Sequence, residues 1–398
     1  MVSEKTTPLF DAVSKLVADT LMGFDKNNFT LAVLLDVSKA FDTLDHHMLL
    51  HKLGRAGIHG AALSWLESYL SARTQMVSFR GTLSGQKQLC CGVPQGSIFG
   101  PVLYLVYAND ISNGVQYSSI IQYADDTTLY LSGSSFEEVI SNVNRDLYNL
   151  TDWMKANKLA ISASKTQVIV FSKNSLHRTP NFPKVKIVED ILGYQDTVRL
   201  LGIFLDSGLT WKAHIDNVYL KISRSLYALN RMKHFFSIIV LKAVYFGLVH
   251  CHLTYGISLW GSASNKELNK LLIVQKRALR CIHHKPYNSH TAQLFKSAQI
   301  VNIFDLFRLE NIKLAHRFLN HTLPESLSAL FGVSASIHTH NTRRANCLHI
   351  PGFNSDKLKK SFLYQVPFCW GRVVATVDVT KGWPAIAAKL KDELTSEY

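Results

Sequence analysis

The sequence lacks the cysteine spacing of a disulfide framework or of a common zinc module. Its 398 residues contain six cysteines and no C-x-x-C pair, a usage that fits a reducing compartment. Cysteine and histidine nevertheless gather within residues 250–252 and 281–284. Two interpretations of these clusters stay open: a zinc site of unusual spacing, or buried thiols beside surface histidines.

The sequence also lacks a hydrophobic run long enough to cross a membrane. Its most apolar stretch, Ser237 to Trp260, is interrupted by Lys242, His250 and His252, whereas a membrane helix needs about 20 apolar residues. The N-terminus has charged residues and no apolar signal core, and the chain has no internal repeat and no low-complexity tract. We therefore expect buried helices in a soluble protein, and no membrane partner.

Positive charge is concentrated in the C-terminal half of the chain. Residues 1–175 contain 14 Lys and Arg against 15 Asp and Glu, whereas residues 176–398 contain 29 against 14. A basic module joined to a near-neutral one indicates that one half holds a polyanion and the other half processes it. A generally basic surface is the alternative that charge alone leaves open.

The hydrophobic pattern predicts an α+β domain followed by a mainly helical region. The predicted strands are residues 31–36, 75–79, 87–91, 120–122, 127–131 and 168–171. The predicted helices are residues 9–22, 46–53, 60–70, 101–110 and 136–159. A polar, proline-containing boundary follows at 172–183, then one strand at 198–204, helices over 213–320, and a less regular remainder.

Three acids interrupt segments that should be buried strands. Asp36 ends the apolar run Leu31–Leu35, and Asp125-Asp126 lie inside a predicted hairpin. Carboxylates at such places are costly unless something neutralises them, and divalent cations do so. Two metal ions about 3.5–4 Å apart stabilise both the attacking and the leaving oxygen of a phosphoryl transfer, and Mg²⁺ prefers oxygen ligands. The pattern predicts a two-metal site, with an ordinary polar turn at Asp125-Asp126 as the alternative.

Four segments, taken in order, resemble the A, B, C and D motifs of reverse transcriptases. They are LDVSKAFD at 35–42, CGVPQGSIFGP at 91–101, YADD at 123–126 and NKLAISASKT at 157–166. In detail they are similar to non-LTR (LINE-type) retrotransposons, particularly jockey-like elements. Further similarity lies at 68–75, 107–110 and 199–203, and in Trp211 and His214. The resemblance covers about residues 1–320, and the order of the motifs is far more specific than any one of them.

The resemblance implies catalytic roles for several residues. Asp36 and Asp125 would be the principal ligands of two Mg²⁺ (or Mn²⁺) ions, with Asp126 beside them. Phe41 would lie under the incoming sugar and exclude a 2′-hydroxyl, or else be a core residue. Lys165 would protonate the leaving pyrophosphate or neutralise its charge, or else be a solvated surface lysine.

The resemblance also implies contacts to substrate and primer. Gln95 and Gly96 match the loop that packs on the nucleotide and template, with a plain turn as the alternative. Tyr123, which opens the YADD motif, belongs to the same substrate-binding set. Arg73 is either a phosphate contact or a helix-end charge. Leu201-Gly202 matches the turn that grips the primer end.

The implied architecture is a polymerase right hand: an antiparallel palm sheet with packed helices, a helical thumb and an extension. We expect the palm with partial fingers at 1–175, a connection with the primer-grip hairpin at 176–212, a basic thumb at 213–320 and a C-terminal extension at 321–398. The implied activity is RNA-directed DNA polymerisation, which adds dNTP to a DNA primer on an RNA template. The implied location is an intracellular ribonucleoprotein in the nucleus, the cytoplasm or both, and the oligomeric state stays open.

The sequence departs from the family in one respect. Full-length relatives carry a fingers region before the first palm motif and an endonuclease further upstream, whereas only about 35 residues precede Asp36 here. We therefore expect a truncated copy, a partial gene model or a fragment of a longer polyprotein. The alternative function is a catalytically inactive, nucleic-acid-binding remnant, and a third is an interaction protein with a chance set of motifs.

Overall fold

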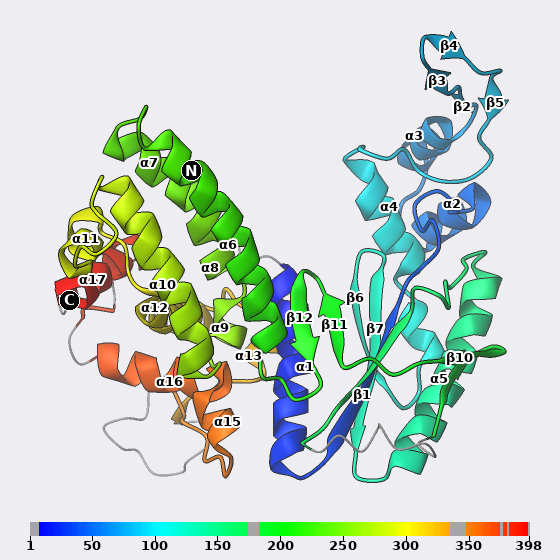
Figure 1. The fold of residues 1–398 in the computed structure, drawn as a ribbon. Helices are drawn as coiled ribbons and strands as arrows, with labels where there is room; N and C mark the ends of the chain where they lie inside the picture. Colours follow the sequence, from blue (N-terminus) through cyan, green and yellow to red (C-terminus); the bar gives the residue numbers. More distant parts are fainter. Residues whose placement is uncertain (1–7, 174–182, 335–347, 375–376, 380–381, 397–398) are drawn as a thin grey trace. The chain divides into compact units, whose positions relative to one another are not determined.

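The computed structural model describes residues 8–173, 183–334, 348–374, 377–379 and 382–396. The chain divides into two compact units, one of residues 28–198 and one of residues 1–27 and 199–398 (Figure 1). The N-terminal helix α1 (Pro8–Asp25) is confirmed as a helix. It belongs to the same unit as the C-terminal half, a grouping that the sequence did not predict.

The unit of residues 28–198 is built on a four-stranded antiparallel sheet. Its spatial order is β6-β7-β1-β8, with every neighbouring pair antiparallel. The strands are β1 (Phe29–Leu35), β6 (Ser119–Tyr123), β7 (Asp126–Gly133) and β8 (Gln167–Phe171). The predicted central strand is confirmed, because β1 pairs on both edges and six of its seven residues are buried.

The helices of this unit follow one another in the predicted order. They are α2 (His46–Arg55), α3 (Ala61–Leu70), α4 (Phe99–Ala108), the 3-10 turn η1 (Ile111–Gly114) and α5 (Phe136–Ala156). The α5 helix begins at Ser135, whose side chain accepts a hydrogen bond from the amide of Glu138, the N-terminal cap that the sequence predicted. Its buried face joins the core over the sheet through residues such as Val143 and Leu147, and Figure 1 shows α5 beside the strands.

Small hairpins complete this unit. The predicted strands 75–79 and 87–91 form one excursion that splits into two short ladders. These are β2 (Thr74–Gln75) with β5 (Lys87–Gln88), and β3 (Ser78–Phe79) with β4 (Thr82–Leu83). Another hairpin pairs β9 (Val185–Ile187) with β10 (Asp190–Leu192).

The second unit is mainly helical, as predicted for residues 213–320. Besides α1, its long helices are α6 (Lys212–Met232), α10 (Asn265–Ile282) and α12 (Ile303–Leu319). Shorter ones are α7 (Ile238–Tyr245), the π-helix η3 (Phe246–His250), α8 (Cys251–Thr254), α9 (Ile257–Trp260), α11 (Ala292–Ala298) and α13 (Glu325–Ser328). In the described part of the chain, no helix combines the length and the hydropathy that a membrane span requires.

Two details of the predicted pattern are wrong. The single strand expected at 198–204 is a hairpin of β11 (Thr197–Leu200) and β12 (Ile203–Asp206), because Leu201 and Gly202 both have positive φ and turn the chain back. The segment after residue 320 is not irregular where it is described. It contains α15 (Asp356–Lys360), α16 (Phe362–Val373) and α17 (Trp383–Ser396), and α16 packs on α12.

A buried histidine joins the β11–β12 hairpin to α6. His214 is 3% exposed, packs beside the Trp260 ring at 5.5 Å between centroids, and its Nδ1 accepts a hydrogen bond from the amide of Phe204 (3.3 Å). Burial, with a smaller contribution from the charge of Lys221, lowers the pKa of His214 to about 4. The folded protein therefore holds this imidazole neutral at a pH where the unfolded chain protonates it.

We expect His214 to make the protein less stable in mild acid. As pH falls from about 6.5 to about 4, His214 binds a proton in the unfolded state and not in the folded state. This difference lowers the free energy of unfolding by about 2–4 kcal/mol. His214→Gln should remove that part of the pH dependence of the unfolding free energy, measured by urea unfolding from pH 7 to pH 4. Replacing the exposed His59 by Gln is the control, and a wild-type slope in His214→Gln would contradict the assignment.

Candidate active site

The pairing of β1 with β7 brings the three predicted acids to one end of the sheet. Leu35, the last residue of β1, pairs with Thr127, so Asp36 emerges beside the β6–β7 turn. That turn is Ala124-Asp125, and it is closed by the pair Tyr123–Asp126. Ala124 has a φ of 51°, a left-handed conformation that is uncommon for a residue with a side chain and is often kept at functional sites.

The charges of the three carboxylates act on one another. The pKa of Asp126 is raised, first by partial burial and then by the negative charges of Asp125 and Asp36. The ammonium of Lys165 lies 3.7 Å from Oδ2 of Asp36, but both side chains are well exposed, at 71% and 41%. An exposed pair of this kind contributes at most about 1 kcal/mol. One solvated lysine therefore does not balance three acids, and the site retains excess negative charge.

This excess suits a hard divalent cation. Carboxylate oxygens are the ligands that Mg²⁺ prefers, and a bound cation reverses the mutual repulsion that raises a carboxyl pKa. Across the described residues, however, no three His, Cys, Asp or Glu side chains gather as a group that could hold a metal ion. The cysteine and histidine clusters at 250–252 and 281–284, which lie within the described residues, likewise form no such group. The three acids therefore offer the oxygen donors that Mg²⁺ prefers, but the described structure does not bring them together as a three-ligand group.

An aromatic pair lies beside the acids. Tyr104 of α4 is 1% exposed, and its pKa is raised by burial and then by the charges of Asp125 and Asp126. The ring of the half-buried Phe41 lies 5.1 Å from the Tyr104 ring, centroid to centroid. Tyr104 therefore connects the predicted sugar-contacting residue to the predicted metal ligands.

The loop before α4 is tied to the segment after Asp36. The amide of Gly92 donates to the carbonyl of Leu44 (2.8 Å), and the amide of Val93 donates to that of Phe41 (2.9 Å). Gly92 has a φ of +82°, and a Cβ there would lie 2.7 Å from the carbonyl oxygen of Asp42. Only glycine allows both the backbone angle and the close approach.

Two other predicted residues line a polar cavity next to this loop. Gln95 donates from Nε2 to Oδ1 of Asp42 (2.8 Å). Gln95, Asp42, Lys39 and Arg73 all border a cavity of about 620 Å³. The lining of this cavity thus combines two cationic side chains and an amide with the carboxylate of Asp42.

The remaining predicted residues are placed as follows. Tyr123 is half-buried and closes the acid hairpin, whereas Gly96 is exposed with a φ of +79°. Leu201 and Gly202, both at positive φ, form a turn in the other unit.

Sequence reasoning missed the residues that support the site. Tyr104 looked like an ordinary apolar residue of a predicted helix. His46, which hydrogen-bonds the carbonyl of Gly92 through Nε2 (2.7 Å), and Asp42 gave no separate signal. Their partners are about 50 residues away along the chain, so only the fold identifies them.

Gly92 and Gly96 offer a matched test of this loop. We expect Gly92→Ala to lower the unfolding free energy by at least about 3 kcal/mol, because the new Cβ must displace the backbone at Asp42. Gly96→Ala meets nothing within 4 Å, so it should cost only the strain of a positive φ, about 1–2 kcal/mol. Urea unfolding of both variants measures the difference, and equal losses would contradict the close packing of Gly92 on Asp42.

Comparison with known proteins agrees with the motif order. The family model described as "Reverse transcriptase (RNA-dependent DNA polymerase)" matches residues 4–205. The matched range is about half of the chain and includes every predicted site residue of both units.

Similar curated proteins come from insect mobile elements. The chain is 27% identical over 342 residues to the RNA-directed DNA polymerase from mobile element jockey of Drosophila melanogaster, covering 82% of this chain and 36% of that protein. It is 30% identical over 337 residues to the probable RNA-directed DNA polymerase from transposon BS of the same fly, covering 78% and 36%. The chain thus spans about a third of the length of these curated relatives.

A solved telomerase structure from Candida albicans, in complex with a fragment of telomeric RNA, also matches. The match covers 77% of this chain and 54% of that chain, at 12% identity and a TM-score of 0.32. A TM-score this low supports no detailed comparison. The family match over residues 4–205 shows that the chain belongs to the reverse transcriptase (RNA-dependent DNA polymerase) family.

Proposed function

We propose that this chain is an RNA-directed DNA polymerase of a non-LTR retrotransposon. The observation that carries the proposal is the strand register that places Asp36, Asp125 and Asp126 at one end of the sheet, where burial and then the charges of Asp125 and Asp36 raise the pKa of Asp126. Family membership and the names of the jockey and BS relatives support it. The reaction is attack by a primer 3′-hydroxyl on the α-phosphate of a dNTP, with release of pyrophosphate.

Asp36 and Asp125 would hold two Mg²⁺ (or Mn²⁺) ions, with Asp126 beside them. When bound, these ions supply the positive charge that stabilises phosphoryl transfer. Lys165, already 3.7 Å from Asp36, would face the leaving pyrophosphate and donate a proton or neutralise its charge. The cavity with Arg73, Lys39 and Gln95 would accept phosphate groups of the nucleotide or template.

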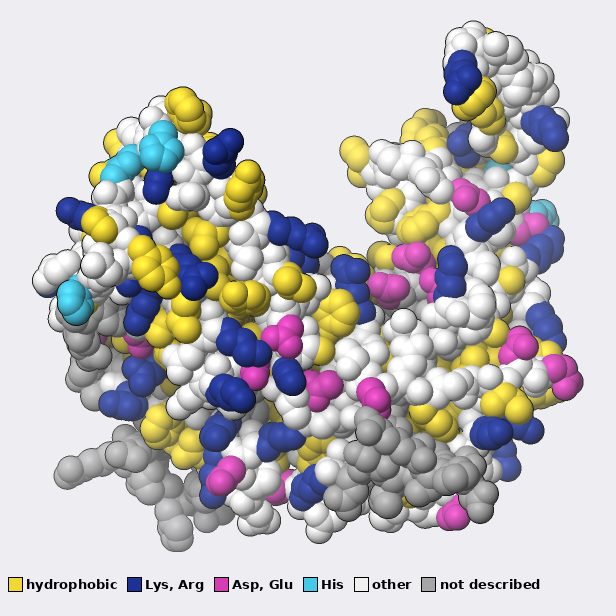
Figure 2. All heavy atoms as spheres, in the orientation of Figure 1, with side chains coloured by type: hydrophobic (Ala, Val, Ile, Leu, Met, Phe, Trp, Pro, Cys, Tyr) yellow, Lys and Arg dark blue, Asp and Glu magenta, His cyan; other side chains and the backbone are white. Residues whose placement is uncertain are grey.

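The basic helical unit would hold the RNA template and the DNA primer. It contains 29 Lys and Arg against 15 Asp and Glu, whereas the unit of residues 28–198 contains 14 of each. Basic side chains stripe α6 and α10: Lys221, Arg224, Arg231, Lys276, Arg277 and Arg280. Figure 2 shows Lys and Arg side chains mixed with hydrophobic ones over these helices. Such a surface suits a phosphate backbone and exposed bases, and it supports our proposal that the chain belongs to an intracellular ribonucleoprotein.

Removal of one acid charge tests the proposed site. Asp125→Asn should reduce primer extension on an RNA template by at least about 1000-fold, because a neutral amide is a poor ligand for the proposed ions. Binding to the primer–template duplex should stay within about twofold at matched salt, since that contact is largely electrostatic. Extension assays and fluorescence anisotropy measure the two effects.

The exposed Asp152 of α5, paired with Lys155, provides the control variant Asp152→Asn, which should keep wild-type extension. Normal extension by Asp125→Asn would exclude Asp125 as a metal ligand. Salt-dependent binding without extension by the wild type would instead identify a non-catalytic remnant.

Phe41 should select the sugar of the nucleotide. Phe41→Ala should lower the preference for dNTP over rNTP by at least about tenfold, because its ring is the group expected to clash with a 2′-hydroxyl. Single-nucleotide incorporation with both substrates gives the ratio. Phe79→Ala, at a 70% exposed position in the β3–β4 hairpin, is the control, and an unchanged ratio in Phe41→Ala would leave Phe41 as a packing residue.

A further inference from the structure

The turn between β11 and β12 is held by a tyrosine from the break between α8 and α9, 54 residues away in sequence. The hydroxyl of Tyr255 donates a hydrogen bond of 2.5 Å to the carbonyl oxygen of Leu201. The ring covers Gly202, since a Cβ built there would lie 3.6 Å from Cε1 and 3.7 Å from Oη of Tyr255. The two residues of this turn are the predicted primer grip.

Tyr255 is itself fixed by the break between α8 and α9. Its carbonyl accepts a hydrogen bond from Nε1 of the fully buried Trp260 (2.9 Å). The next residue, Gly256, has a φ of +65°, and a Cβ there would lie 2.7 Å from Cδ1 of Ile203. Gly256, at the break between α8 and α9, therefore packs closely on Ile203, the first residue of β12.

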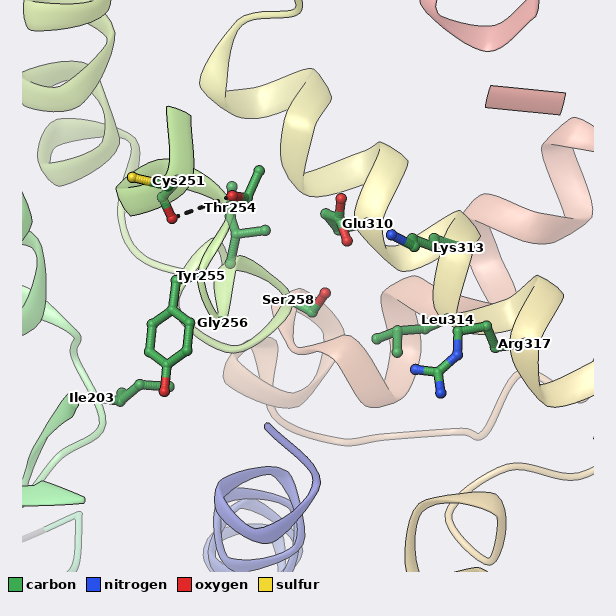
Figure 3. Close-up of a pocket in the computed structure, with 11 residues that line it drawn as sticks. Ile203, Cys251, Thr254, Tyr255, Gly256, Ser258, Glu310, Lys313, Leu314 and Arg317 are labelled. Carbon is green, nitrogen blue, oxygen red and sulfur yellow. Dashed lines mark hydrogen bonds between the residues drawn. The ribbon is translucent and has the colours of Figure 1, made fainter. Parts of the chain in front are cut away.

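Figure 3 shows the Tyr255 ring reaching Ile203 at the edge of a cavity of about 260 Å³. Tyr255 is 36% exposed, so its ring is not simply a core residue. From this partly exposed position, its hydroxyl donates to the backbone carbonyl of Leu201 in the turn.

This contact orients a whole peptide group. The peptide bond between Leu201 and Gly202 is trans, like the others described, and is planar, so its C=O and N–H point in opposite directions. Because the carbonyl points to Tyr255, the Gly202 amide N–H points away from it. If the hydrogen bond from Tyr255 were lost, the peptide group between Leu201 and Gly202 could rotate, and the Gly202 N–H would change direction.

We propose that Tyr255 is a positioning residue that sets the orientation of the Leu201-Gly202 turn for the primer end. This inference rests on the proposed polymerase function, within which it adds a residue that no sequence motif marked. Tyr255 acts through the turn and takes no part in the chemistry.

Tyr255→Phe removes the hydroxyl and keeps the ring, so it tests the hydrogen bond alone. In the full chain, we expect amide hydrogen exchange over residues 199–205 to become about 5–10-fold faster. We expect the KM for the primer–template to rise about 3–10-fold, while the KM for dNTP and the kcat at saturating primer stay within about twofold. Tyr364→Phe, which removes the same atom from α16 in the same unit, should change none of these values.

Gly202→Ala provides an independent variant. The site has room for a Cβ, but the φ of +84° strains the turn without removing the hydroxyl. If Tyr255 acts through this turn, the double variant should raise the primer KM by much less than the product of the single effects.

Several outcomes would overturn the proposal. Unchanged exchange over 199–205 in Tyr255→Phe would show that the hydroxyl does not hold the turn. Faster exchange with a wild-type primer KM, or a parallel change in both KM values and kcat, would leave a purely structural role. Absence of extension by the wild type would instead defeat the proposed function, and the exchange measurement would still report whether Tyr255 holds the turn.

Discussion

The antiparallel pairing of β1 with β7 is the interaction on which the candidate active site depends. A register in which Leu35 faces Thr127 leaves Asp36 next to the turn that carries Asp125 and Asp126. A slip of one residue would send every side chain of β1 to the opposite face, so that Leu31, Val33 and Leu35 would leave the core that they now fill. The burial of apolar side chains that fixes this register thereby also places three like charges at one end of the sheet, an arrangement that their mutual repulsion opposes.

The loop before α4 depends on a second constraint, the close approach of Gly92 to Asp42. Hydrogen bonds from Gly92 and Val93 join this loop to the segment that follows Asp36. The same segment contains Phe41, which packs on Tyr104, and Asp42, which accepts a hydrogen bond from Gln95. Hydrogen bonds and ring packing therefore join the segment of Asp36 and Phe41 to the loop of Gly92 and Gln95, although the two segments lie about 50 residues apart in sequence.

Much of the fold could be predicted from local pattern. The apolar run before Asp36 predicted a buried strand, and Ser135 followed by two glutamates predicted the start of α5, because both signals lie within a few residues. The turn at Leu201-Gly202 was implied by the family resemblance and not by the pattern, since Leu201 is an unusual residue at a positive φ. The helices α16 and α17 were missed because the sequence there lacks a clear boundary signal.

The parts that could not be predicted are contacts between distant segments. No local pattern indicates that α1 joins the C-terminal unit, or that Tyr255 binds the carbonyl of Leu201. Tyr104 likewise has no motif of its own, and its role emerges only from its place beside Asp125 and Phe41. Positions of charged side chains relative to one another require the fold, which is why the acids could be named from sequence but their coupling could not.

The central claim is that the three acids form a divalent-cation site. Electron paramagnetic resonance of Mn²⁺, titrated into the chain in the presence of primed RNA and dNTP, measures this site directly and independently of turnover. We expect the wild type to bind Mn²⁺ that Mg²⁺ displaces, and we expect Asp36→Asn to bind Mn²⁺ at least about tenfold more weakly. Equal Mn²⁺ binding by wild type and Asp36→Asn would contradict it.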